Sequence, residues 1–241
     1  YSGQGNGLMM VSASIEQSSG WEQSMTLGLA NKLTTFDSHK LLFPHMTVGV
    51  MGSAGGDLPA DVRQRVRRLG AAIGYRGHVL ITGACPGLPH DAVAGAKEHG
   101  GFVVGISPAH NLVEHVTKYN SPTRGYDTIV YTGSGLMGRE VENIMSCDAV
   151  IFAGGRSGAL GEFAIAYEEG KVIGVFESTG GITDHLDKII DFLGKKTDAI
   201  VCYDADPERL LDQVEQVYET HVLPSRLRAL EGRSADGQLD P

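Results

Sequence analysis

Short apolar runs alternate with longer amphipathic stretches through the middle of the chain. Seven apolar runs predict buried strands, at residues 47–51, 78–82, 102–106, 128–131, 149–153, 172–176 and 199–203. Apolar residues between these runs recur at helical spacing and predict helices over 59–75, around 92–96, over 138–146, after Gly158, over 186–193 and from Pro207 onward. The segment before 128–131 contains Pro108, Pro122 and Gly125 and predicts a loop. Strands that alternate with helices in this way favour a doubly wound α/β fold, in which a mainly parallel sheet of about seven strands carries helices on both faces. The predicted architecture is therefore Rossmann-like.

The same pattern divides the chain into three parts. Residues 1–44 are polar and irregular, and we interpret them as an N-terminal extension or arm in which a short helix could form over 21–33. Residues 45–220 hold all the predicted strands and form the Rossmann-like domain. Residues 221–241 are expected to be a polar C-terminal tail, frayed from Leu223 onward because Pro224 and two glycines follow.

Composition and charge narrow the function classes. The net charge of −9 gives no electrostatic reason to expect nucleic-acid binding, and no apolar run approaches the roughly 20 residues that span a membrane. Three widely spaced cysteines are typical of reduced thiols in a cytoplasmic protein, and scattered histidines do not predict a metal site. The 33 glycines fall mostly at strand-to-helix junctions, which favours a binding site for a phosphorylated small molecule.

Glycine-rich turns follow several of the predicted strands. Backbone N–H groups in such turns can close around an anion at the positive end of the following helix, and parallel strands bring the turns to one edge of the sheet. The candidate phosphate- and nucleotide-binding residues are Gly52, Ser53, Gly83, Gly135, Gly154, Gly155, Arg156, Ser157, Gly158 and Ala159. A structural alternative is that residues 154–158 only make a tight turn. NAD binding is disfavoured because Gly52-x-x-Gly55-Gly56 lacks the dinucleotide spacing.

Arg139 and Glu162 flank this glycine turn and are the candidate catalytic residues. Arg139 lies at the start of an amphipathic helix, and Glu162 lies one turn into the helix after the glycines. Each has a structural alternative. Arg139 could pair within its own helix with Glu142 or Asn143, and Glu162 could simply stabilise the dipole of its helix.

The segment from Arg139 to Glu162 resembles the signature of the LONELY GUY (LOG) nucleotide phosphoribohydrolases, long labelled lysine decarboxylases. It is still more similar to the related molybdenum-cofactor carrier proteins. The shared pattern is an arginine, an Asp-Ala strand opening at 148–149, and then P-G-G-x-G-T-x-x-E, represented by 154–162. This chain is an atypical member because Gly154 replaces the proline, Arg156 the second glycine and Ala159 the threonine. Residues 132–139 lie between the LOG pattern and the Thr-Gly-x-Gly-x-Ala-Arg-Asn of the carrier-like group.

The resemblance implies a hydrolase that cleaves the N-glycosidic bond of a nucleoside 5′-monophosphate, releasing free base and ribose 5-phosphate without a cofactor. Glu162 would stabilise positive charge on the ribose, and Arg139 would orient the substrate. The alternative is a non-catalytic protein that binds or carries a nucleotide or a phosphorylated pterin, such as the molybdenum cofactor. A third class is a signalling module with residues 1–44 as its contact. The resemblance also implies a homodimer or a larger homo-oligomer.

Overall fold

The computed structural model describes residues 45–230, which are built around one seven-stranded sheet. The strands are β1 (Thr47–Gly52), β2 (Val79–Thr82), β3 (Phe102–Ser107), β4 (Thr128–Tyr131), β5 (Ala149–Ala153), β6 (Val172–Phe176) and β7 (Ile200–Asp204). Their spatial order is β4-β3-β2-β1-β5-β6-β7, and every neighbouring pair is parallel. The predicted fold class is confirmed. The order of the strands reverses between β1 and β5, so the loops after these two strands diverge at the carboxyl edge.

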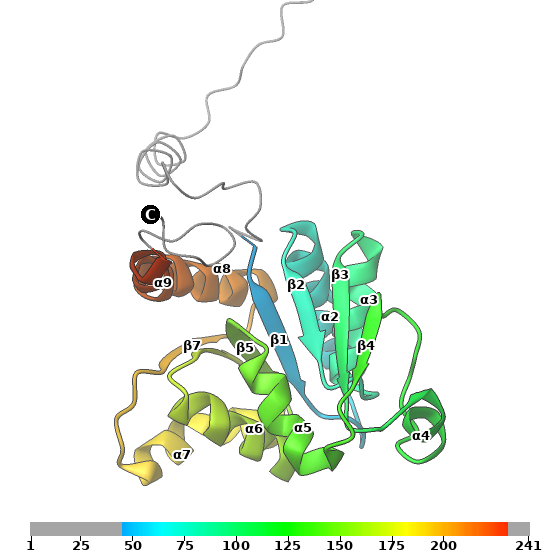
Figure 1. The fold of residues 1–241 in the computed structure, drawn as a ribbon. Coiled ribbons are helices and arrows are strands. Elements are labelled where there is room, and N and C mark those ends of the chain that lie inside the picture. The colour runs from blue at the N-terminus through cyan, green and yellow to red at the C-terminus, as the bar shows by residue number, and fades with distance from the viewer. Residues whose placement is uncertain (1–44, 231–241) are drawn as a thin grey trace, which may run out of the picture. The chain divides into compact units, whose positions relative to one another are not determined.

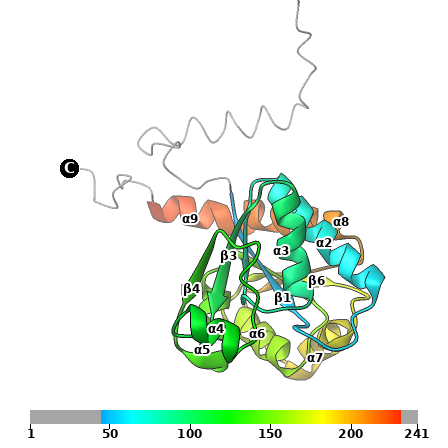
Figure 2. The same ribbon diagram turned by 90° about the vertical axis from the view of Figure 1, so that its right-hand side faces the viewer.

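Helices cover both faces of the sheet (Figures 1 and 2). Helices α2 (Ala60–Tyr75), α3 (Leu88–Glu98) and α8 (Pro207–Val217) share one apolar core, and α5 (Gly135–Met145), α6 (Ser157–Glu168) and α7 (Leu186–Leu193) share the other. A 3-10 turn, η1 (Gly181–His185), precedes α7. The short helix α4 (Leu112–Thr117) occupies the connection before β4, where the sequence predicted a loop. None of the helices in residues 45–230 has the length and apolar character of a membrane span.

Strand β5 shows how the sequence builds two cores from one sheet. Ala149, Ile151 and Ala153 belong to the core under α2, α3 and α8, whereas Val150 and Phe152 belong to the core under α5 and α6. Successive side chains of a strand point to opposite faces, so a central strand covered on both sides must be apolar at every position. All five residues of β5 are buried.

Asp148, which opens β5, ties the amino ends of two central strands together. Its Oδ2 accepts hydrogen bonds from Thr47 N at 2.8 Å and from Thr47 Oγ1 at 3.0 Å, and Oδ1 is paired with Arg226. These bonds outweigh burial and lower the pKa of Asp148. The Asp-Ala element of the sequence signature is therefore structural, at the edge of the sheet opposite the glycine turns.

The C-terminal end differs from the predicted frayed tail. A π-helical turn, η2 (Tyr218–Val222), continues α8 into α9 (Leu223–Leu230), and Tyr218 and Leu223 are buried in the first core. Pro224 is the second residue of α9, which directly follows the π-helical turn, where the regular hydrogen-bond pattern of the helix is already interrupted. Residues 1–44, with the helix expected over 21–33, and residues 231–241 lie outside the described part.

Candidate functional site

A cleft of about 660 Å³ opens at the carboxyl edge of the sheet, where the loops after β1, β2, β3 and β5 meet the first turns of α5 and α6. This is the place where the order of the strands reverses, which is where open α/β sheets bind ligands. The structure brings together at this cleft the predicted residues Gly52, Ser53, Gly83, Arg139, Arg156, Ser157, Gly158, Ala159 and Glu162.

Three predicted binding glycines lie outside the lining of the cleft and shape the loops behind it. Gly154 N donates to Thr179 Oγ1 at 2.8 Å, and Gly155 N donates to Ser53 Oγ at 2.6 Å, so both amides are already occupied. Both residues have a positive φ, which favours glycine. Gly135 N donates to the carbonyl of Pro108 and fixes the start of α5. These contacts give the three glycines a role in positioning the loops.

The first turn of α6 supplies three hydrogen-bond donors that have no acceptor among the described residues. They are the backbone amides of Ser157, Gly158 and Ala159. Unpaired amides at the start of a helix carry partial positive charge and form a ready site for an anion. Arg156 immediately precedes this turn, is exposed in the cleft and forms no ion pair within residues 45–230. Together these groups can hold a phosphate.

Arg139 and Glu162 meet deeper in the cleft, on facing turns of α5 and α6. Arg139 Nη1 donates to Glu162 Oε1 at 3.0 Å, and both residues are buried, at 9% and 6% exposure. Asn143 Nδ2 donates to the same oxygen at 3.2 Å. The ion pair joins α5 to α6, so Arg139 does not pair within its own helix, as the structural alternative proposed. Glu142 accepts a hydrogen bond from Ser134 Oγ instead.

Gly83, at the end of β2, makes room for the guanidinium. A Cβ atom at this position would lie 2.3 Å from Arg139 Nη1 and 2.8 Å from Cζ. The glycine that follows β2 therefore serves the close approach of Arg139 to the strand end. Arg139 Nε is buried without a hydrogen-bond acceptor among the described residues, and Asn143 Oδ1 is buried there without a donor. Unpaired buried polar atoms of this kind are costly and cluster where a ligand or water completes a site.

Burial raises the pKa values of three side chains that line the cleft. Burial raises the pKa of Glu162, although Arg139 and Asn143 act in the opposite direction and the neighbouring Glu140 adds to the rise. Burial also raises the pKa of Glu140 and raises that of the Cys85 thiol to about 11. Glu162 can accept a hydrogen bond or stabilise a developing positive charge, whereas Cys85 stays a neutral thiol at neutral pH.

Several lining residues were not among the predicted site residues: Cys85, Pro108, Lys118, Tyr119, Ser121, Leu136 and Glu140. Lys118 and Tyr119 come from the end of α4 and the turn after it, a segment that the sequence predicted as loop. His90 and Asp91, in the first turn of α3, do not line the cleft: Asp91 is paired with Arg63, and His90 lies against the carbonyl of Arg124.

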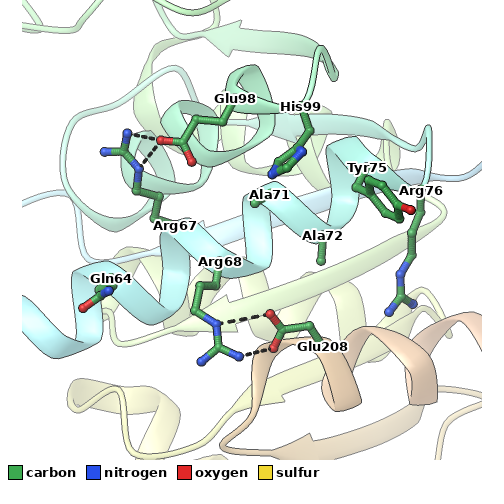
Figure 3. A pocket seen from close by; sticks show the side chains of 10 residues that line it. All are labelled: Gln64, Arg67, Arg68, Ala71, Ala72, Tyr75, Arg76, Glu98, His99 and Glu208. Carbon is green, nitrogen blue, oxygen red and sulfur yellow. Dashed lines mark hydrogen bonds and ion pairs between the residues drawn. The ribbon is translucent and has the colours of Figure 1, made fainter.

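A second hollow lies between α2, α3 and the start of α8, away from the glycine turns (Figure 3). Its arginines are already paired, Arg67 with Glu98 and Arg68 with Glu208. This leaves little free charge to recruit an anion there. Within residues 45–230, no three His, Cys, Asp or Glu side chains are grouped to hold a metal ion.

Comparison with known proteins places the chain among relatives of the same architecture. An uncharacterised protein of Archaeoglobus fulgidus is 35% identical over 126 residues, which cover 52% of this chain and 76% of that protein. The molybdenum cofactor binding protein of Rippkaea orientalis is 26% identical, with a TM-score of 0.60 over 73% of this chain and 98% of its own. The molybdenum cofactor carrier protein of Chlamydomonas reinhardtii is 25% identical, with a TM-score of 0.59 over 73% of this chain and 99% of its own.

These similarities confirm the resemblance to the carrier-like branch of the LOG superfamily. A sequence model of one protein family matches residues 45–211, which contain every strand of the sheet and all the cleft residues described above. The model is that of the SLOG cluster4 family, and the chain belongs to that family.

Proposed function

We propose that this chain binds a nucleotide or a phosphorylated pterin in the cleft, with the phosphate on the first turn of α6. The observation that carries the proposal is the set of three amides, at Ser157, Gly158 and Ala159, that find no acceptor in residues 45–230, beside Arg156, which forms no ion pair there. A doubly charged phosphate can accept hydrogen bonds from all of these donors at once. Two similar proteins bind or carry the molybdenum cofactor, which supports a pterin as one ligand class.

The remainder of the cleft suits the rest of such a ligand. A volume of about 660 Å³ lies within the range of small-molecule sites. Arg139 and Glu162 line the interior, beyond the phosphate donors, and offer one guanidinium and one carboxylate to hydroxyl groups of a sugar or to polar atoms of a ring. The cleft thus combines an anion site with a polar interior.

A second candidate function is hydrolysis of a nucleoside 5′-monophosphate, favoured by the Arg139–Glu162 pair. As the N-glycosidic bond breaks, its electron pair leaves with the base and positive charge develops on the ribose. Glu162 would stabilise that charge and orient water, whose oxygen bonds to C1′ while its proton passes to the carboxylate or to the departing base. Arg139 would hold substrate, because guanidinium is too basic to donate its proton readily.

Isothermal titration would test the binding proposal. Nucleoside 5′-monophosphates, including N6-modified adenylates, and a pterin phosphate would be compared with their dephosphorylated counterparts. We expect only the phosphorylated compounds to bind, and Arg156→Ala to weaken them about tenfold because a charge-assisted hydrogen bond is lost. The control Arg67→Ala removes an arginine of α2 that does not line the cleft and should leave the affinity unchanged. Equal binding of phosphorylated and dephosphorylated compounds would contradict the proposal.

Chromatography of the same mixtures would separate the two candidate functions. Release of free base and ribose 5-phosphate by the parent chain, with loss in Glu162→Gln, would support the hydrolase. Saturable binding without release would support the carrier alternative. Absence of both would refute the two functions together.

The assembly and the location of the protein remain predictions. A homodimer or larger homo-oligomer, implied by the resemblance, would be tested by light scattering of the full chain, and a cytoplasmic location by fractionation. Removal of residues 1–44 in the light-scattering experiment would test the third class, a module that assembles through its arm. An unchanged mass and ligand affinity would count against that class.

A further inference from the structure

Glu140 is a buried carboxylate at the cleft with no partner in the part of the chain that the structure describes. It lies on α5, is 7% exposed and lines the cleft. Its side chain makes no hydrogen bond or ion pair with any of the described residues. The adjacent Arg139 instead gives its guanidinium to Glu162. Burying most of a carboxylate without a partner costs free energy, so its place at the cleft calls for an explanation.

Two glycines on α6 create the space for this carboxylate. A Cβ atom at Gly158 would lie 3.3 Å from Glu140 Oε1, and one at Gly161 would lie 2.9 Å from Oε2. The glycines are three residues apart, so they share one face of α6, which is the face that meets α5. The slot holds the carboxylate in one place beside the helix instead of leaving it to swing freely in solvent.

Apolar and aromatic residues that line the same cleft as Glu140 supply an apolar wall for a flat ring. Leu136 lies one helical turn before Glu140 on α5, is 56% exposed and lines the cleft. Pro108, which also lines the cleft, is fixed beside it because its carbonyl accepts from Gly135 N at 3.2 Å. Tyr119 contributes an aromatic ring to the same cleft. An apolar wall with one carboxylate can hold a heterocycle whose N–H groups meet that carboxylate.

We propose that Glu140 is a specificity-determining residue that selects ligands carrying a 2-amino-4-oxo heterocycle, the edge shared by guanine and pterin. The proposal rests on the proposed binding function. That edge presents a ring N–H and an amino N–H side by side, and a carboxylate can accept both in parallel bonds, as it does from an arginine fork. The phosphate occupies the first turn of α6, and the ring lies along α5.

Other heterocycles fit this carboxylate less well. Adenine presents one amino group beside an acceptor nitrogen, so the second carboxylate oxygen would face a lone pair. Hypoxanthine keeps the ring N–H but lacks the 2-amino group, so one hydrogen bond is lost. Sites built to pair buried polar groups reject analogues that leave those groups unpaired.

The test compares ligands that differ in the 2-amino group alone. GMP and IMP form one pair, and pterin-6-ylmethyl phosphate with the matching lumazine, which has oxygen in place of the amine, forms the other. We expect the full-length chain to bind the 2-amino member at least about tenfold more tightly in one pair or both, in line with the discrimination of a bidentate contact. Which pair shows the preference identifies the nucleotide or the pterin as the source of the ring.

Glu140→Gln links the preference to this side chain, because the amide keeps one acceptor and adds a donor. We expect it to weaken the 2-amino ligand about tenfold and to bring the ratio within each pair close to one. Glu168→Gln, at the far end of α6 and paired with Lys195, is the matched control and should change neither affinity nor ratio. If Glu140→Gln does not fold, as judged by circular dichroism, the affinity ratio within each ligand pair, measured on the parent chain, still tests the proposal: equal affinities would overturn it.

The outcomes separate this proposal from the one on which it rests. Phosphate-dependent binding with equal affinity inside both pairs would overturn the role of Glu140 and leave the binding function in place. A preference that survives Glu140→Gln would also overturn it. Failure of every phosphorylated compound to bind would overturn both.

Discussion

Gly83→Ala should destabilise the protein by displacing Arg139 from its buried partner. The backbone of Gly83 lies outside the positive-φ region, so alanine can adopt it without strain. The new Cβ atom, however, would lie 2.3 Å from Arg139 Nη1 and 2.8 Å from Cζ. The guanidinium must move, and the hydrogen bond to Glu162 is lost or weakened.

The expected magnitude follows from two opposing contributions. A hydrogen bond to a charged group contributes about 1.5–3 kcal/mol when its partners are buried. Replacement of glycine by alanine recovers about 0.4–1 kcal/mol through the lower entropy of the unfolded chain. The free energy of unfolding should therefore fall by about 1–2 kcal/mol.

Urea denaturation of the parent and variant chains would measure the difference. Gly55→Ala is the matched control, because a Cβ atom there meets nothing within 4 Å and the φ of Gly55 is not positive. We expect Gly55→Ala to change the free energy of unfolding by no more than about 0.5 kcal/mol. A Gly83→Ala variant as stable as the parent would refute the argument that Gly83 exists to admit Arg139.

Three further predictions concern other parts of the fold. Asp148→Asn should lower the free energy of unfolding at pH 7 by about 1 kcal/mol, through weaker bonds to Thr47. The pKa of Asp148 is lower in the folded chain, so its contribution to stability is present above the unfolded pKa of about 4 and disappears as the pH falls through the folded value. Urea denaturation at pH 3 and pH 7 should therefore show a smaller difference in unfolding free energy between the parent and the variant at pH 3. The same difference at both pH values would contradict the assignment. Burial raises the pKa of the Cys85 thiol to about 11. Iodoacetamide should therefore alkylate Cys85 far more slowly at pH 8 in the native chain than in urea, as followed by peptide mass spectrometry. Equal rates of alkylation would contradict a raised pKa. Gly161→Ala should raise the free energy of unfolding, measured by urea denaturation, by up to about 1 kcal/mol through better helix propensity. It should also reduce any preference for the 2-amino ligands because it displaces Glu140, and an unchanged preference would argue against the slot.

The central strands were predictable because a strand covered by helices on both faces must be apolar at every position. Residues 149–153 and 172–176 are continuous apolar runs, and the structure buries every one of them between two layers of helices. Helix α4 was missed because Leu112, Val113 and Val116 are all exposed, so no buried face marks it in the sequence. Its signal was local: Asn111 caps the helix by accepting from the amide of Glu114.

The site was only partly predictable, because sequence spacing indicates which loops converge but not where their donors point. Gly154 and Gly155 belong to the glycine motif, yet their amides are bound by Thr179 and Ser53, from loops distant in the sequence. Glu140 was missed for the same reason. Its role depends on two glycines of the neighbouring helix, and this contact between α5 and α6 is visible only once both are in place.

Amide chemical shifts in the first turn of α6 test the central claim most directly. In the ¹H–¹⁵N correlation spectrum, GMP or a pterin phosphate should move the signals of Ser157, Gly158 and Ala159, the three amides that lack acceptors in the described structure, in a saturable way. Guanosine or the dephosphorylated pterin should leave them in place at the same concentration. Saturable binding that leaves these three amides unmoved would contradict the proposed phosphate site.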